Sequence, residues 1–102
     1  MHARVWQLRI LPGKLEEFAD TVESLIVPAR KQEGFRGVIA LRMDAGTAPE
    51  VLLVSLWDSV ANLRATEKNL FVTKAIARIM TCCQGVPSIH EHEVLVSEFA
   101  AD

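Results

Sequence analysis

Two histidines separated by one residue are the first feature of the sequence that could support chemistry. His90 and His92 fall on the same side of an extended chain, with Glu91 on the other side. Such a pair on a strand has metal-ligand geometry, and one imidazole could instead accept a phenol proton near neutral pH. We expect His2 at the far end of the sheet, on the order of 25 Å away. With no third ligand nearby, we expect no metal site. The alternative to a proton acceptor is a pair of exposed histidines on an edge strand.

Two tryptophans and an asparagine form the second group of candidates. Trp57 follows an apolar run and could stack on a flat aromatic ligand, or it could seal the core at a strand-to-helix turn. Asn62 could donate a hydrogen bond to a ligand oxygen, or it could be an exposed residue early in a helix. Trp6 could line the same cavity or fill it. The residue types alone leave each pair of alternatives open.

Other chemistry has little support in the sequence. Cys82 and Cys83 are adjacent, so we expect two reduced thiols packed near a helix end rather than a disulfide or a zinc knuckle. The formal net charge of -2 gives no argument for binding nucleic acid or an anionic membrane. No apolar run approaches the roughly 20 residues of a membrane span, and the first residues lack a signal-peptide pattern. The expected location is therefore the cytoplasm.

The elements that must position these side chains follow from the periodicity of apolar residues. The pattern predicts strands over 4–11, 35–44, 50–57 and 88–99, with a turn over 45–49. It also predicts a helix from about Lys14 with a kink or stop near Val27, because Pro28 interrupts it. A short helix opens at Asp58-Ser59 and ends near Thr66, and another runs from about Leu70 to Cys83. With 102 residues, this order specifies one α+β domain over 1–102, a ferredoxin-like split β-α-β fold with a four-stranded antiparallel sheet.

The middle strands carry apolar side chains on both faces. Right-handed crossovers place both helical segments on one face of the sheet, so the other face needs a cover. Large apolar side chains left in water would forfeit about 1.5–3 kcal/mol each. A homodimer formed through the sheet face is the simplest cover. In the strand over 50–57, the apolar side chains on one face are Val51, Leu53 and Trp57, and those on the other face are Leu52, Val54 and Leu56.

Three short segments together resemble the antibiotic biosynthesis monooxygenase-like (ABM) family of the dimeric α/β-barrel superfamily. They are Pro12-Gly13-Lys14 at the start of a helix, Glu33-Gly34-Phe35-Arg36-Gly37 entering a strand, and Leu56-Trp57-Asp58-Ser59 leaving one, followed by Ala61-Asn62-Leu63-Arg64-Ala65. The resemblance covers nearly the whole chain. It implies a dimeric α/β barrel with a ligand pocket in each subunit, between the helices and the sheet. The implied lining residues are Trp6, Leu8, Phe18, Val22, Trp57, Asn62 and Phe71.

The resemblance also implies a type of reaction, the oxidation of a substrate by O₂ without a cofactor. Monooxygenases of this family need no metal or flavin, because a phenolate substrate supplies electrons to oxygen directly. The heme-degrading branch carries an axial histidine where this chain has Ile76, which cannot ligate iron. The active-site tyrosine of some members has no counterpart, because the chain contains no tyrosine.

Two functional hypotheses follow from these observations. The first is a cofactor-independent monooxygenase acting on a small aromatic or polyketide-like compound, in which Trp57 orients the ring, Asn62 bonds an oxygen and His92 or His90 accepts a proton. The second is a non-catalytic homodimeric module that binds a small apolar ligand. An open cavity beside Trp57 that holds Asn62 and a histidine nitrogen would favour the first hypothesis.

Overall fold

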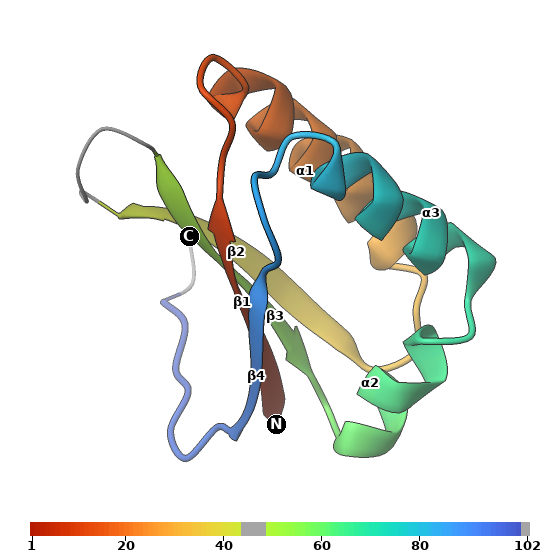
Figure 1. Cartoon of the computed structure of the whole chain (residues 1–102). Helices are drawn as coiled ribbons and strands as arrows, with labels where there is room; N and C mark the ends of the chain where they lie inside the picture. Colours follow the sequence, from red (N-terminus) through yellow and green to blue (C-terminus); the bar gives the residue numbers. More distant parts are fainter. Residues whose placement is uncertain (44–48, 101–102) are drawn as a thin grey trace.

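The sheet and its helices follow the predicted order in a computed structural model that describes residues 1–43 and 49–100. The elements are β1 (His2–Arg9), α1 (Leu15–Ala29), β2 (Phe35–Met43), β3 (Glu50–Trp57), α2 (Val60–Thr66), α3 (Leu70–Met80) and β4 (Ser88–Glu93) (Figure 1). Residues 44–48, which include most of the predicted turn, lie outside the described residues. In the described part of the chain, no helix is long and apolar enough to cross a membrane.

All strand pairs are antiparallel, in the order β2-β3-β1-β4. Helices α1 and α3 lie side by side across one face of the sheet, and α2 lies at the end of the sheet where β3 ends (Figure 1). This is the ferredoxin-like α+β arrangement that the sequence predicts. The strand order results from two β-α-β units that interleave, so that β1 and β3 become the central strands.

Particular side chains cap the N-termini of α2 and α3. Ser59 precedes α2, and its hydroxyl accepts a hydrogen bond from the Asn62 backbone N–H at 3.1 Å. Asn69 precedes α3, and its side chain accepts from the backbone N–H groups of Phe71 and Val72 at 2.8 and 3.3 Å. Each cap satisfies N–H groups that the first turn of a helix leaves unpaired.

Several predicted boundaries are wrong by a few residues. The helix α1 continues through Pro28 to Ala29, because a proline so close to the end of a helix removes only one late hydrogen bond. The helix α3 ends at Met80 rather than Cys83. The strand β4 ends at Glu93 rather than Phe99. Within the strand predicted over 88–99, residues 88–93 are the ones that pair with another strand in the described part of the chain, since β1 begins at His2, opposite Glu93.

The hydrophobic core lies between the two long helices and one end of the sheet. Leu8 and Phe18 are each 1% exposed and both belong to it. The cluster of buried residues consists of Leu8, Ile10, Phe18, Val51, Ile79 and Cys82. Both cysteines are free thiols, as expected, and burial raises the pKa of the Cys83 thiol. This core sets the distance between the helices and the sheet at one end of the sheet. At the other end, near Trp57, different residues line the space between helices and sheet.

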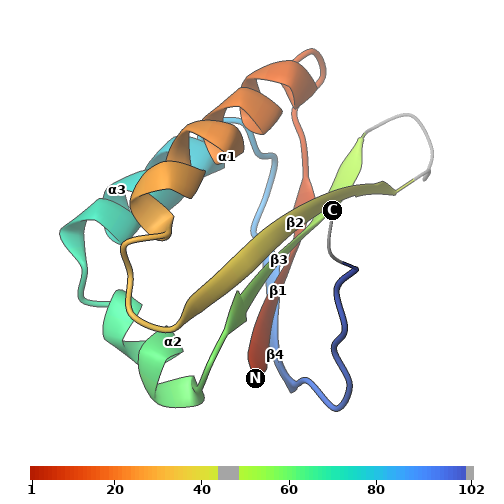
Figure 2. The same cartoon turned by 180° about the vertical axis from the view of Figure 1, so that it is seen from behind.

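No helix of the described residues covers the second face of the sheet. Val54 in β3 stands between Val5 of β1 and Ile39 of β2 on this face, and Leu41 lies beside Leu52 in the next row. Ile39 and Leu41 remain 44% and 48% exposed. The segment after β4 runs on this side of the sheet (Figure 2), but its Leu95 is 87% exposed. This face therefore remains an apolar surface in the single chain.

Candidate functional site

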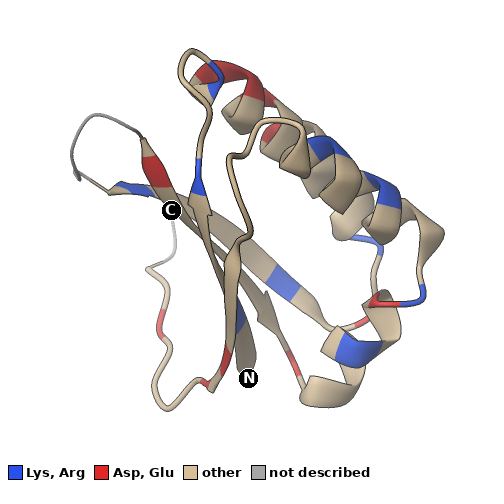
Figure 3. Ribbon diagram, in the orientation of Figure 1, with Lys and Arg blue, Asp and Glu red and all other residues tan. Residues whose placement is uncertain are grey.

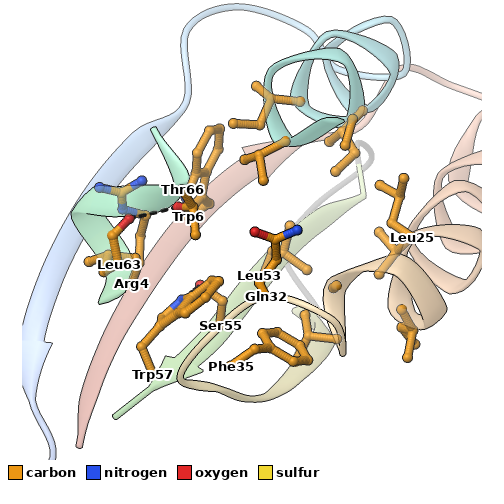
Figure 4. A pocket seen from close by; sticks show the side chains of 18 of the residues that line it. Arg4, Trp6, Leu25, Gln32, Phe35, Leu53, Ser55, Trp57, Leu63 and Thr66 are labelled. Carbon is orange, nitrogen blue, oxygen red and sulfur yellow. Dashed lines mark hydrogen bonds between the residues drawn. The ribbon is translucent and has the colours of Figure 1, made fainter. Parts of the chain in front are cut away.

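A cavity of about 150 Å³ lies between the helices and the sheet, at the end where Trp57 completes β3. Its floor comes from β1, β2 and β3, and its other walls come from α1, α2 and α3. Figure 4 shows the labelled side chains converging on this space from the strands and helices. The lining is mostly aromatic and aliphatic and includes Trp6, Val22, Leu25, Phe35, Leu53, Trp57, Leu63, Phe71 and Ile76. A cavity of about this volume with apolar walls accommodates a single aromatic ring.

Trp57 is held in one orientation at the edge of this cavity. It is only 6% exposed, and its ring meets that of Phe35 edge to face, with centroids 5.3 Å apart and planes at 71°. The indole N–H donates to the Ser55 hydroxyl at 3.1 Å. An edge-to-face pair of this kind stabilises both rings by about 0.5–1.5 kcal/mol beyond their burial. Trp57 therefore belongs to the packed interior and also walls the cavity.

The other predicted lining residues divide into two groups. Trp6, Val22 and Phe71 line the cavity. Leu8 and Phe18 are instead part of the buried core, next to the cavity but without a surface on it. Leu8 shares a face with Trp6, but it stands opposite Val51, one row further along β1, where the two long helices close on the sheet.

Asn62 is engaged in the capping of α2 and does not line the cavity. Its side-chain oxygen accepts a hydrogen bond from the Ser59 hydroxyl at 2.8 Å, while its backbone N–H donates to the same hydroxyl. The Asn62 side chain also packs directly on the backbone of Gly34, where an added Cβ would overlap it. In this geometry the Asn62 side chain packs the start of α2 against the loop before β2.

An alanine at position 34 should therefore destabilise the protein more than an alanine at position 13. Gly13 and Gly34 share a φ of 79°, but a Cβ at Gly13 meets nothing within 4 Å among residues 1–43 and 49–100. Gly13→Ala should cost about 1–2 kcal/mol from the left-handed backbone alone, and Gly34→Ala at least about 1 kcal/mol more from overlap with Asn62. Urea unfolding measures both. Asn62→Ala keeps the Asn62 Cβ, which would lie 2.7 Å from the added Cβ, so it should remove only part of the difference. Equal losses for the two glycine variants would contradict the contact.

The two histidines of β4 lie on the face of the sheet away from the cavity. His90 stands beside Val5 and His92 beside Ala3, and their rings stack 6.3 Å apart. The structure does not bring them to Trp57. The expectation that His2 lies far away is wrong, because His2 pairs with Glu93, directly after the Ala3–His92 pair. Alternation puts the His2 side chain on the opposite face. No group of three metal-ligating side chains occurs within residues 1–43 and 49–100.

The polar part of the cavity was not predicted from the sequence. Arg4, Gln32, Ser55 and Thr66 all line it. Alternation along β1 places Arg4 on the same face as Trp6 and could have identified it. The Arg4 side chain is 14% exposed, and its Nη2 lies 2.7 Å from Glu67 and 3.7 Å from Glu91. Its Nε is buried and has no hydrogen-bond partner among the described residues. Such a donor costs about 1–3 kcal/mol when it stays unpaired.

A cluster of opposite charges surrounds the outer end of Arg4. Arg64 of α2 lies 3.0 Å from Glu67 and 2.7 Å from Glu91, so both carboxylates contact two guanidinium groups. Figure 3 shows charges of both signs close together around α2. The hydrogen bond from Arg4, followed by that from Arg64, lowers the pKa of Glu67. The bond from Arg64 likewise lowers the pKa of Glu91. Both carboxylates are therefore ionised at neutral pH and hold Arg4 in place.

These features define the class of protein: a ferredoxin-like α+β domain with one bare sheet face and a mostly apolar cavity between helices and sheet. Residues 1–78 match the family described as Antibiotic biosynthesis monooxygenase (ABM). The chain belongs to the ABM family.

Known structures share this fold at low sequence identity. A Nitrosomonas europaea protein described as a putative antibiotic biosynthesis monooxygenase has a TM-score of 0.78 at 11% identity. The match covers 94% of this chain and 100% of that protein's chain. A conserved protein from Methanosarcina mazei Go1 has a TM-score of 0.76 at 17% identity, covering 90% and 91%. A protein of unknown function from Nitrosomonas europaea has a TM-score of 0.74 at 21% identity, covering 99% and 95%. No curated protein is significantly similar in sequence.

Proposed function

We propose that this chain is a cofactor-independent monooxygenase of the ABM type, which oxidises a small aromatic or polyketide-like compound in the cavity beside Trp57. The observation that carries the proposal is the cavity itself, about 150 Å³ in volume and walled by Trp6, Phe35, Trp57 and Phe71. Aromatic walls of this kind suit a flat, electron-rich ring. The volume favours one ring rather than two.

The reaction requires only the substrate, oxygen and a dry site. A phenol that is converted to a quinone loses its O–H proton and one ring hydrogen and gains one oxygen atom from O₂. The second oxygen atom leaves as water with those two hydrogens, so the ring supplies all the electrons. The walls of the cavity would hold the ring and exclude water while charge moves onto oxygen. Ile76 lines the cavity where the heme-degrading branch has its axial histidine, and its side chain cannot bind iron.

We also infer that two copies pair through the bare face of the sheet. Val5, Ile39 and Val54 form a continuous apolar row across three strands of that face. Packing two such faces together would remove this surface from water, which single chains cannot do. The cavity lies on the other side of the sheet, so each subunit of the dimer would keep its own site.

The positions of Asn62, His90 and His92 favour a second candidate function. None of the three lines the cavity, so the proton acceptor and the oxygen ligand expected from the sequence remain predictions. Without them the cavity resembles a binding site more than a reaction site. The second candidate is a non-catalytic homodimeric module that binds a small apolar or aromatic ligand.

Oxygen consumption distinguishes the two candidates. Wild-type protein should consume oxygen with at least one member of a panel of single-ring hydroquinones and phenols. Trp57→Phe keeps an aromatic wall but loses the bond to Ser55, so we expect turnover to fall by about tenfold, and Trp57→Ala by more. Val60→Ala, a change at an exposed site on α2, is the control and should keep full activity. Binding of the ring without oxygen consumption would favour the second candidate, and identical rates in wild type and Trp57→Ala would rule out the first.

A further inference from the structure

Gln32 contributes a neutral polar side chain to the wall of the cavity. It lies in the short loop between α1 and β2 and lines the cavity. Its backbone N–H donates to the Ala29 carbonyl at 3.0 Å, and its own carbonyl accepts from the Phe35 N–H at 3.2 Å. Figure 4 shows the Gln32 carboxamide, with its nitrogen and its oxygen, in the space that the other labelled side chains enclose. The loop therefore holds Gln32 in place, with its side chain directed at the cavity.

Asn69 determines the orientation of this carboxamide. The side-chain oxygen of Asn69 accepts the backbone N–H groups of Phe71 and Val72, so this oxygen must face the start of α3. The NH₂ group of Asn69 then faces Gln32, and its Nδ2 donates to the Gln32 Oε1 at 3.1 Å. With Gln32 turned the other way, two donor groups would face each other. The cap of α3 therefore fixes the oxygen of Gln32 on Asn69 and leaves the Gln32 NH₂ group as the free end.

The free NH₂ group of Gln32 is a donor that a ligand can reach. Its Nε2 makes no hydrogen bond among the described residues. In the described part of the chain, the buried side-chain nitrogen or oxygen that lacks a partner is the Nε of Arg4. The Nε2 of Gln32 also lacks a partner but is not buried, because Gln32 is only half-buried. Water or a ligand in the cavity can therefore accept its hydrogen bond.

The chemistry of this wall favours a neutral acceptor. An amide NH₂ group is an uncharged donor, and most of the lining is apolar. The charge of Arg4 is already offset by Glu67 at 2.7 Å and Glu91 at 3.7 Å. An anion bound at Gln32 would lose its hydration without gaining a counter-charge, whereas a carbonyl oxygen needs only the hydrogen bond.

We propose that Gln32 determines which rings the cavity selects, by donating a hydrogen bond from its Nε2 to an uncharged carbonyl oxygen on the ligand. A single aromatic ring bearing a ketone or amide group meets this requirement. The ring lies against Trp57 and Phe71, and the carbonyl points toward the loop before β2. Asn69 is a positioning residue, since it acts only through Gln32. This inference rests on the proposed function only in that a ring occupies the cavity.

Calorimetric titration with a matched pair of ligands tests the role of Gln32. Acetophenone has a carbonyl oxygen where α-methylstyrene has a CH₂ group, and the two have similar shapes. Gln32→Met keeps an unbranched side chain of similar length but removes the donor. The affinity of acetophenone relative to α-methylstyrene should therefore fall about fivefold from its wild-type value. Glu33→Met makes a comparable change at the exposed neighbouring position and should leave the wild-type ratio unchanged.

Asn69→Asp tests the orientation of Gln32 without changing Gln32 itself. Aspartate keeps an oxygen that caps α3, but its second oxygen accepts hydrogen bonds where the NH₂ group of Asn69 donates one. The NH₂ group of Gln32 should turn toward this oxygen, so that Oε1 faces the cavity. The affinity of acetophenone relative to α-methylstyrene should again fall. The affinity of pyrrole, whose N–H only donates, should rise relative to that of furan, a reversal that a loss of packing would not produce.

Several results would overturn the inference. They are an unchanged ratio of acetophenone to α-methylstyrene in Gln32→Met, an equal fall in Glu33→Met, and wild-type ratios for both ligand pairs in Asn69→Asp. A wild type that does not bind acetophenone would also overturn it. Oxygen consumption by the wild type with the panel of phenols would leave the proposed function standing in each of these cases, so the two failures can be told apart.

Discussion

Replacing Leu8 with alanine is expected to lower the free energy of unfolding by about 2–5 kcal/mol. Leu8 is 1% exposed and packs with Phe18 and Val51 in the core cluster. Removing its three outer carbons leaves a void that two long helices and a sheet cannot close without losing other contacts. In a chain of this size, the loss should lower the melting temperature by about 10 °C or more. Thermal and urea unfolding at fixed protein concentration measure the effect.

Leu70 offers the same substitution at an exposed site. It is 67% exposed at the start of α3, so Leu70→Ala should change the free energy of unfolding by less than about 0.5 kcal/mol. The comparison also tests where Leu8 lies, because the sequence places it in the ligand pocket and the structure places it in the core. A small effect of Leu8→Ala on stability, together with a large effect on ligand affinity, would show that the structural placement is wrong.

Replacing Val54 with aspartate should dissociate the proposed dimer. Val54 lies at the centre of the bare sheet face, between Val5 and Ile39. In the dimer an aspartate there would be buried between two sheets without a cationic partner, and a buried unpaired charge costs several kcal/mol. The dissociation constant should rise by at least about a hundredfold. Analytical ultracentrifugation from nanomolar to high micromolar concentration measures this constant directly.

The same substitution on the helical side is the control for this prediction. Val60 is 42% exposed at the first position of α2, where an acidic side chain suits the helix dipole. Val60→Asp should leave the dimer intact. A wild-type protein that sediments as a single chain at high micromolar concentration would contradict the dimer. So would a Val54→Asp variant that sediments like the wild type.

The sequence specified the fold well, because each element carries its own signal. The strand over 50–57 was predicted with the bounds that the structure has, since its apolar run is stopped on one side by Pro49 and on the other by Asp58-Ser59. The end of β4 was missed, because Leu95, Val96 and Phe99 continue a strand-like pattern, while the described residues place no partner strand beside them. The pairing of strands depends on the whole sheet, and no local sequence pattern predicts it.

The candidate site was predicted less well than the fold. Trp57 and Trp6 line the cavity, since large aromatic side chains on the inner face of a strand pack into the layer beneath the helices. Their roles toward a ligand stay predictions. Asn62 and Arg4 were misjudged in opposite directions. Asn62 matched a family pattern but is used in the cap of α2, whereas Arg4 was not among the predicted site residues but lines the cavity. Which polar side chains reach a cavity depends on contacts between distant elements, here α2 with β1.

The occupancy of the cavity can be tested directly by nuclear magnetic resonance. The chain has two tryptophans, so two indole N–H signals are expected, and Trp57→Phe identifies which belongs to Trp57. Titration with 4-nitrophenolate should shift the Trp57 signal and give nuclear Overhauser contacts from the ligand ring to Trp57 and Phe71. If the ligand binds but its contacts run to Val54 and Ile39 on the bare sheet face, with both indole signals unchanged, the cavity is not the binding site.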